Sequence, residues 1–411
     1  MKALVYSLTP SRWVICKLAG FVSRRAFYGA ISPLRLREVV VPSLPGPEWV
    51  RLRTVLGGVC GTDLVLVTQR NHPATLLQNF ARFPAVLGHE NVALVDAIGP
   101  AVSSWRQGQR VCVEPAGGCY SYAPNAVCPQ CAEGRPTLCE RGGNGYLPPR
   151  ALLGLNPLTG GSWGDYFVAH QSQVHAVPDG VSDDEAVLVD PLASAAHAVL
   201  RRPPRPGESV LVTGVGIMGL GLIAAIRALG HENAVTAVAR HPFQADLAKR
   251  LGATDAVLLR RTMKAAQRYA MIARSCNGQA LPGRFGSADL LGGFDLTFDC
   301  TGNGSGLSDA FKWTRSRGVV VVVGTSGIAV LDTTSIWFNE LEIIGANGRQ
   351  MEAVGGRRVH TYDLVLDWLA GRRIDLTAIH VSRFRLADYR TAFAQLLGRG
   401  RHAIVKAAFE P

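Results

Sequence analysis

The residues with the most evident chemistry are cysteines in the segment NAVCPQCAEGRPTLCERG, residues 125–142. Cys128, Cys131 and Cys139 have C-x2-C-x7-C spacing in a basic stretch that is punctuated by Gly and Pro and has too few apolar residues for a core element of its own. Thiolates are good zinc ligands, and a closed structural site needs four of them, whereas a site with three protein ligands keeps one position open for chemistry. The fourth ligand therefore decides what this segment does.

Two further residues could bind metal. Cys60 in GVCGTD and His89 in VLGHEN are each flanked by small residues and apolar runs. This pattern predicts turns at the edge of a packed domain, which would hold a ligand rigidly. Considered alone, His89 would more often be a hydrogen-bonded core histidine and Cys60 a small core residue. His197, in an alanine-rich helical pattern, is interpreted as a packing residue or as a residue that contacts a metal ligand, but not as a ligand itself.

A glycine motif predicts a dinucleotide site. In VLVTGVGIMGLG, Gly214, Gly216 and Gly219 form G-x-G-x-x-G directly after an expected strand and at the start of an expected helix. The first glycine permits a tight turn, the second lets the backbone approach a pyrophosphate, and the third lets the helix pack on the strand. The helix N-terminus supplies N–H donors to the phosphates.

The residue at the end of the next expected strand, AVTAVAR, favours NADP. NAD sites usually have Asp or Glu there, about 20 residues beyond the glycines, to bind the ribose 2′-hydroxyl. This chain has Arg240, followed by His241. A guanidinium pairs well with a 2′-phosphate, so we expect NADP. NAD remains possible, because Arg240 could instead stack on an adenine.

Length and composition indicate an enzyme with two domains. The 411 residues exceed what one core usually supports, and 47% of them are apolar. The longest apolar run, 210–226, is shorter than the roughly 20 residues of a spanning helix. The N-terminus has no convincing signal-peptide cleavage site, so a cytoplasmic location is expected, and nine cysteines then indicate thiols or metal sites.

The net charge of +12 is uneven, because residues 240–284 hold nine Lys and Arg against Asp246 and Asp255. Aromatic residues do not alternate with these cations as they do on strand-stacking surfaces. A solvated helix face is therefore expected, with a polyanion site as the alternative. The role of the basic segment 254–293 stays open.

The element pattern predicts an α/β protein. Short strands separated by turns extend to about residue 180, which indicates a β-rich domain. A helical pattern then begins, with Ser182 and Glu185 as a capping box and Pro191 as the first position of a second helix. From about residue 208, apolar strands alternate with amphipathic helices, which predicts a doubly wound parallel sheet.

Seven motifs occur in an order that resembles the zinc-dependent medium-chain alcohol dehydrogenases, especially the polyol, sugar and threonine dehydrogenase branch: GVCGTD, LGHE, the cysteine cluster, DPLASAAHAV, VLVTGVGIMGLG, FDCTG and IVK. The resemblance implies a GroES-like catalytic domain at 1–190 that carries a zinc lobe, a Rossmann domain at 191–346, and a segment at 347–411 that returns to the catalytic domain. It also implies a homodimer or homotetramer.

The resemblance assigns a catalytic zinc to Cys60, His89 and Asp190, where the polyol branch has glutamate at the third position. Asp also ligates zinc through oxygen. Alternatively, Asp190 caps the helix that follows it. Glu90 corresponds to a glutamate that can approach the metal during ligand exchange.

Other family roles fall on residues near these motifs. Thr62 matches a hydroxyl that relays the substrate proton. Asp63 corresponds to a carboxylate that orients the zinc histidine, with a turn-stabilising role as the alternative. The predicted cofactor site comprises the three glycines and Arg240 together with Ile217, Met218, Thr301 and Gly324.

The structural-zinc lobe departs from the family spacing, C-x2-C-x2-C-x7-C. Asn125 occupies the first ligand position, and Cys119 lies nine residues before Cys128. If the loop bends back, Cys119 completes a closed site with Cys128, Cys131 and Cys139. The alternative is a degenerate lobe in which the metal is lost or weak.

The sequence thus predicts an oxidoreductase with two zinc ions per chain that transfers hydride between NADP(H) and an alcohol or carbonyl compound such as a polyol, a sugar or another secondary alcohol. One alternative is an NADPH-dependent reductase of a conjugated C=C or C=N bond without catalytic zinc. A zinc-ribbon nucleic-acid binder would leave the dinucleotide motif unexplained. We expect a small-molecule substrate, with neither nucleic acid nor membrane as partner.

Overall fold

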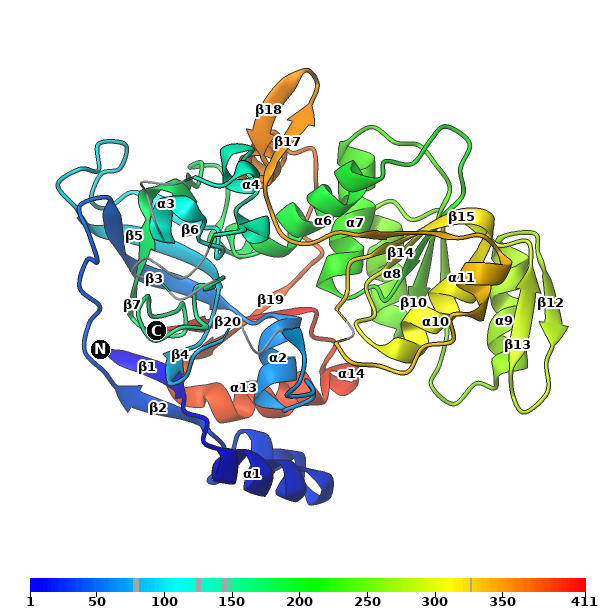
Figure 1. Cartoon of the computed structure of the whole chain (residues 1–411), viewed down its shortest axis with the longest axis horizontal. Helices are drawn as coiled ribbons and strands as arrows, with labels where there is room; N and C mark the ends of the chain where they lie inside the picture. Colours follow the sequence, from blue (N-terminus) through cyan, green and yellow to red (C-terminus); the bar gives the residue numbers. More distant parts are fainter. Residues whose placement is uncertain (77–80, 123–126, 142–146, 148–149, 326) are drawn as a thin grey trace. The chain divides into compact units, whose positions relative to one another are not determined.

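The computed structural model describes residues 1–411 except 77–80, 123–126, 142–146, 148–149 and 326. The chain divides into two compact units (Figure 1). The first comprises Met1–Asp190, Gly348–Gly371 and His380–Pro411, and the second comprises Pro191–Asn347 and Arg372–Ile379.

A seven-stranded sheet forms the centre of the first unit. Its order is β19-β20-β3-β5-β6-β8, and β7 pairs with β3. The strands are β3 (Trp49–Gly58), β5 (Glu90–Ile98), β6 (Arg110–Val113), β7 (Tyr166–His170), β8 (Val174–Ala176), β19 (Val381–Arg385) and β20 (Lys406–Glu410). All neighbours are antiparallel except β19 and β20. Alternate side chains such as Leu52, Val95 and Phe167 point into one buried core, as the period of a strand requires.

Smaller elements complete this unit. A second sheet, in the order β2-β1-β4, contains β1 (Lys2–Tyr6), β2 (Leu34–Glu38) and β4 (Ala85–Val86). A hairpin pairs β17 (Met351–Val354) with β18 (Arg357–His360). The helices are α1 (Pro10–Val22), η1 (Arg24–Phe27), α2 (Gly61–Val67), α3 (Cys119–Tyr122), α4 (Pro129–Ala132), η3 (Pro136–Leu138), η4 (Gln171–Gln173), α5 (Asp183–Ala186), α12 (Thr361–Ala370), η5 (Leu386–Asp388), α13 (Tyr389–Leu397) and α14 (Arg399–His402).

The second unit contains a six-stranded parallel sheet in the order β11-β10-β9-β14-β15-β16. Its strands are β9 (Val210–Thr213), β10 (Val235–Ala239), β11 (Asp255–Leu258), β14 (Phe294–Asp299), β15 (Thr314–Val322) and β16 (Glu342–Gly345). Its other elements are α7 (Ile217–Ala228), α8 (Pro242–Arg250), α9 (Ala265–Ser275), α10 (Gly304–Trp313), α11 (Thr334–Phe338) and the hairpin strands β12 (Gln279–Pro282) and β13 (Ala288–Leu291). The strand order reverses between β9 and β14, which is where doubly wound sheets bind ligands.

One helix was not predicted, and one helix start was placed wrongly. The N-terminal region is β-rich as expected but also contains the 13-residue helix α1, which has Thr9 as its N-cap and Pro10 at its first position. Helix α6 (Val189–Arg201) begins two residues before Pro191, so Asp190 lies in its first turn and does not precede it. The capping box at Ser182 and Glu185 is present as predicted.

The basic segment 240–284 forms α8, β11, α9 and part of the β12–β13 hairpin. The hairpin was not predicted, since its strands are only four residues each. None of the described helices is both long and apolar enough to cross a bilayer.

Candidate metal and cofactor sites

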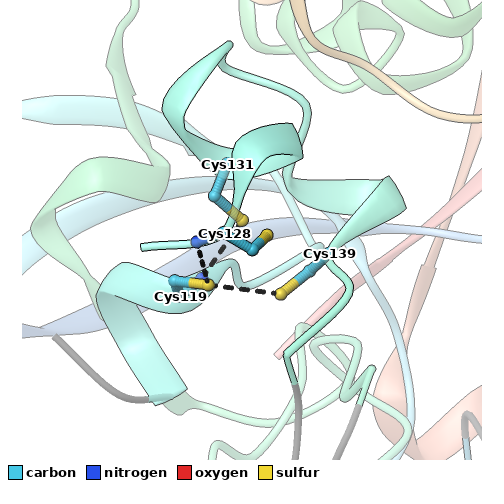
Figure 2. A group of neighbouring side chains, drawn as sticks. All are labelled: Cys119, Cys128, Cys131 and Cys139. Atoms are coloured by element: carbon cyan, nitrogen blue, oxygen red, sulfur yellow. Dashed lines mark hydrogen bonds between the residues drawn. The ribbon is translucent and has the colours of Figure 1, made fainter. Parts of the chain in front are cut away.

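The four lobe cysteines come together. Their sulfur atoms all lie within 4.8 Å of one another, and all four residues are buried. Figure 2 shows Cys119 at the start of α3, Cys128 directly before α4, Cys131 within α4, and Cys139 after η3. The Sγ atoms of Cys119 and Cys139 are 3.6 Å apart. Asn125, which stands where the family usually has its first cysteine ligand, lies outside the described residues.

Backbone amides favour the thiolate of Cys128 in this cluster, whereas burial raises the pKa of Cys131 and raises that of Cys139 to about 11. The amide of Cys119 donates to Sγ of Cys131 (3.3 Å), and the amide of Cys128 donates to Sγ of Cys119 (3.4 Å). Burial raises the pKa of Cys128, but hydrogen bonds from the amides of Cys131 and Glu140 outweigh it and lower that pKa to about 6. Four soft donors with amide support fit a closed zinc site.

Cys60, His89 and Asp63 form a second group, at the ends of two paired strands. Cys60 precedes α2 and His89 precedes β5, whose first residues pair with the end of β3. The amide of Cys60 donates to Oδ2 of Asp63 (2.9 Å), while Oδ1 of Asp63 lies 3.4 Å from Nδ1 of His89. Asp63 is completely buried. One carboxylate thus holds both predicted zinc ligands.

The polar atoms of this group are not all satisfied. Asp63 Oδ1 and His89 Nδ1 are buried, and within the described part of the chain neither makes a well-formed hydrogen bond. Burial lowers the pKa of His89, but the charges of Asp63 and Cys60 outweigh it, so the pKa is raised well above its usual value. A histidine held between a carboxylate and a thiol fits the donor set of a zinc site. Thr62 is exposed, and its Oγ1 is 3.7 Å from Sγ of Cys60.

Asp190 has partners that the sequence reasoning missed. Nε and Nη2 of Arg349 donate to its Oδ1 (2.8 and 2.5 Å), and the Tyr362 hydroxyl donates to the same oxygen (2.6 Å). Burial raises the pKa of Asp190, but Arg349 outweighs it and lowers the pKa. Among the described residues only the lobe cysteines have three or more candidate ligand atoms within 4.8 Å of one another, so Cys60, His89 and Asp190 do not form such a close set. The charge of His89 nevertheless helps to lower the pKa of Asp190, which places the two side chains near each other.

Glu90 is paired with Lys406, another residue that the sequence reasoning did not single out. Nζ of Lys406 donates to Oε2 of Glu90, and both side chains are almost completely buried. Oε1 of Glu90 is buried without a hydrogen bond from any described residue. The signal for Lys406 was present, because it is the last residue of IVK, which the resemblance included.

The glycine motif forms an open cradle at the end of β9. Gly214 has φ +82°, and a Cβ there would lie 3.0 Å from the backbone of Thr301. A Cβ on Gly219 would lie 2.7 Å from the Gly214 carbonyl oxygen, so that glycine permits close packing. A Cβ on Gly216, the N-cap of α7, would meet nothing within 4 Å. This space, beside the free amides of α7, suits a pyrophosphate.

Buried Asp299 supports this cradle from β14 and was also missed. Its Oδ1 accepts from the hydroxyls of Thr213 (2.9 Å) and Thr301 (2.7 Å) and from the amide of Thr301 (3.1 Å). The Gly324 amide donates to the Asp299 carbonyl (2.8 Å). Thr301 and Gly324 therefore lie beside the glycine turn, and their contact with a cofactor stays a prediction.

The remaining predicted residues lie around the same helix or strand ends. Ile217 and Met218 are partly buried in the first turn of α7. Arg240 follows β10 with an exposed side chain, which forms an ion pair with no described residue. His197 is buried within α6.

Comparisons with known proteins agree with this architecture. The family model described as Alcohol dehydrogenase GroES-like domain matches residues 46–179, and the model described as Zinc-binding dehydrogenase matches residues 216–370. The chain belongs to the zinc-dependent medium-chain alcohol dehydrogenase family. The predicted fold class, a GroES-like domain with a Rossmann parallel sheet, is confirmed, and so is the prediction of an oxidoreductase of this type.

Named relatives fall in the polyol and threonine dehydrogenase branch. The chain is 28% identical to an L-threonine 3-dehydrogenase of Anaeromyxobacter dehalogenans (87% of this chain, 90% of the relative) and 29% identical to an L-idonate 5-dehydrogenase of Vitis vinifera (91% of each). Among solved structures, galactitol-1-phosphate dehydrogenase from Escherichia coli shares the fold, with TM-score 0.70, 20% identity and complete coverage of both chains.

Proposed function

We propose that this protein is a zinc-dependent dehydrogenase that transfers hydride between NADP(H) and a secondary alcohol or its carbonyl, of the polyol or sugar class. The observation that supports it most is the arrangement of Cys60, Asp63 and His89, in which one buried carboxylate contacts both predicted ligands. Such carboxylates fix the orientation of a metal-binding histidine and raise its basicity.

Cys60, His89 and Asp190 would hold the catalytic zinc. Oδ1 of Asp190 accepts three hydrogen bonds and its Oδ2 accepts none from the described residues, so we propose Oδ2 as the ligand atom. A zinc ion there would act as a Lewis acid that makes the substrate alcohol easier to deprotonate. Thr62, exposed beside the Cys60 thiol, would accept the substrate proton and pass it to water or ribose. Glu90 would stay with Lys406 unless ligand exchange releases it.

The four lobe cysteines would hold a second, structural zinc. The mutual approach of their sulfur atoms supports the assignment of Cys119 as the replacement ligand. The expected total is two zinc ions per chain.

The test is elemental analysis of zinc in wild type, Cys60→Ala and the control Cys276→Ala, combined with a screen of polyols, sugars and secondary alcohols. We expect two zinc ions in wild type and in Cys276→Ala. Cys60→Ala should retain one and lose activity by roughly 1000-fold, since metal polarisation contributes several kcal/mol to such reactions. One zinc in all three proteins would refute the catalytic site.

A metal-free reductase of a conjugated C=C or C=N bond is the second candidate. The pairing of Asp190 with Arg349 and Tyr362 favours it, because that carboxylate already has charged and polar partners. The same samples decide between the two functions. NADPH-dependent reduction of an enone or imine that survives a chelator and the Cys60→Ala substitution would support the reductase.

NADP is the proposed coenzyme because Arg240 is exposed directly after β10, where a carboxylate would repel a 2′-phosphate. Arg240→Asp should lower kcat/KM with NADPH by roughly 10-fold or more, as expected for loss of a charge-assisted pair of about 1.5–3 kcal/mol, and should not lower it with NADH. Arg260→Asp changes the same charge at an exposed position outside the motif and serves as the control. Equal losses with both coenzymes would contradict the assignment.

We also propose a homodimer or homotetramer. Strand β16 is the edge of the parallel sheet, and nearby Trp337 and Phe338 are 79% and 73% exposed. Exposed aromatic side chains beside an open strand edge suit association between copies. Light scattering after gel filtration would measure the mass, and a monomer at micromolar concentration would contradict this proposal. A cytoplasmic location remains a prediction.

A further inference from the structure

Helix α1 is fixed to the first unit by one side only. Cys16 is completely buried, and its Sγ donates to the carbonyl of Ala26 (3.2 Å). The ring of Phe27 occupies the space beside Gly20, where a Cβ would lie 2.2 Å from it. Lys17 donates from Nζ to the carbonyl of Gln69 (2.6 Å). The helix is therefore held in one orientation, beside α13 in Figure 1.

The opposite side of α1 is apolar and exposed. Val14, Ile15, Leu18, Phe21 and Val22 are 48%, 56%, 62%, 80% and 92% exposed. At the α-helical repeat these five side chains occupy one arc of about 120°. An amphipathic helix on a soluble domain normally turns its apolar face toward the core. In α1 a large part of the apolar surface faces outward instead.

The surroundings of this face are basic. The first 37 residues contain seven Lys and Arg and no Asp or Glu. Two hollows flank α1, one lined in part by Arg25, Arg390 and His402 and the other in part by Lys17, Arg24 and Arg70, and no described acidic residue lines either.

The cations here lack acidic partners. None of Arg24, Arg25 and Arg70 forms an ion pair with a carboxylate of a described residue. Burial and the nearby charge of Arg24 lower the pKa of Arg70, so the two guanidinium groups repel each other. A polyanionic partner would relieve this repulsion, whereas a second copy of the same surface would add to it.

We propose that the outward face of α1, with the basic hollows on both sides, docks onto the surface of an anionic lipid bilayer. A helix with exposed Leu and Phe and flanking Lys and Arg lies in the interfacial plane, where its apolar side chains enter the acyl boundary and its cations meet anionic headgroups. The sequence predicts no membrane partner because it lacks a spanning segment, but a helix that lies on the surface needs none. This inference does not depend on the proposed dehydrogenase activity.

Vesicle flotation of the full-length protein tests the proposal. The probes are vesicles of phosphatidylcholine alone and of phosphatidylcholine with phosphatidylglycerol. We expect wild type to float with the anionic vesicles, less at high salt, and to bind neutral vesicles at least tenfold more weakly. Leu18→Asp and Phe21→Asp should each reduce partitioning roughly 10-fold or more, as expected from the burial of one such side chain. Arg24→Gln and Arg25→Gln should each reduce it roughly fivefold.

The control for the apolar substitutions is Val40→Asp, because Val40 is 91% exposed and lies outside α1. It should bind vesicles like wild type. Circular dichroism melting verifies that each variant is folded. The proposal is overturned if folded wild type does not bind anionic vesicles, if it binds neutral vesicles equally well, or if Phe21→Asp binds anionic vesicles like wild type. Self-association that Phe21→Asp abolishes, without vesicle binding, would assign the face to a second copy and also overturn it.

Discussion

The two candidate metal regions of the first unit are built in opposite ways. In the cysteine lobe the candidate ligands contact one another and receive hydrogen bonds mainly from the backbone of their own segment. In the other region the candidate ligands contact other side chains: Asp63 holds Cys60 and His89, while Arg349 holds Asp190. The cysteine lobe, whose four candidate ligands contact one another, suits a structural ion. Candidate ligands that are held in place by other side chains leave one coordination position free for a substrate.

One segment connects the two regions. Gly348 packs against Thr137 of the lobe, the amide of Met351 donates to the Gly134 carbonyl (2.9 Å), and Arg358 donates to the Glu133 carbonyl (2.8 Å). Between these contacts, Arg349 reaches Asp190. The position of Asp190's partner therefore depends in part on an ordered lobe.

The largest effect is expected from Cys119→Ser, which tests whether the lobe is a closed four-cysteine site. Loss of a structural metal is among the changes that cost about 4 kcal/mol or more. We expect one zinc per chain and a strongly lowered thermal unfolding midpoint for the first unit. Cys276→Ser, at a partly buried cysteine of α9's C-terminal end, is the control and should keep both ions. Two zinc ions in Cys119→Ser would exclude Cys119 as a ligand.

The second-largest effect is expected at the buried ion pair between Arg349 and Asp190. Arg349→Met should destabilise the first unit by about 3–5 kcal/mol, because the Asp190 carboxylate would remain buried without its cation. Chemical denaturation measures the cost. Arg317→Met removes an exposed ion pair with Glu340 and should cost about 0–1 kcal/mol. If the two substitutions cost the same, the Asp190 pair does not stabilise the fold.

Asp63→Asn tests whether zinc binding at Cys60 and His89 depends on the carboxylate that contacts both residues. It should weaken zinc binding at Cys60 and His89, and with it activity, by roughly 10- to 100-fold, since such partners contribute that much. Zinc in the cysteine lobe should be unchanged. Titration with a competing chelator measures both affinities. Asp96→Asn, whose carboxylate pairs with Arg51 near the surface, is the control. Unchanged zinc affinity at Cys60 and His89 would mean that Asp63 only stabilises the turn in which it lies.

Patterns with local causes were predictable from the sequence. The glycine turn, the capping box at Ser182 and the alternation of strands and helices each follow from neighbouring residues, and the structure contains them. The approach of Cys119 to the other cysteines was also predictable, because a missing ligand within a short segment leaves few candidates.

Side chains from distant segments were not predictable in the same way. Asp190 and Arg349 are separated by 159 residues, and Glu90 and Lys406 by 316. No periodicity or spacing relates such positions in a single sequence. Helix α1 was missed for another reason: its apolar residues face outward, so the usual relation between apolar periodicity and core burial does not hold there.

The smallest effect is expected at the end of the connecting hairpin, from His360→Asn. Burial, followed by the charges of His175 and Arg349, lowers the pKa of His360 to about 3, although Asp363 opposes this. The rings of His175 and His360 are stacked, with 4.5 Å between their centroids. Its Nδ1 accepts from the Tyr362 amide (3.2 Å) as the cap of α12, a role that Asn can fill.

The direction in which stability changes with pH follows from the coupling between protonation and folding. A histidine whose pKa is lowered by folding contributes stability that is present above the unfolded pKa of about 6.5 and is lost as the pH falls below it. Wild type should therefore lose up to about 2 kcal/mol more than His360→Asn between pH 7 and pH 5. The main partner of Asp363, His175, is present in both proteins. Denaturation at both pH values measures the difference, with exposed His380→Asn as control. Equal acid sensitivity of wild type and His360→Asn would mean that the end of the hairpin accommodates a charged His360. The contacts of the segment Gly348–His360 with the lobe and with Asp190 would then be looser than those in the structure.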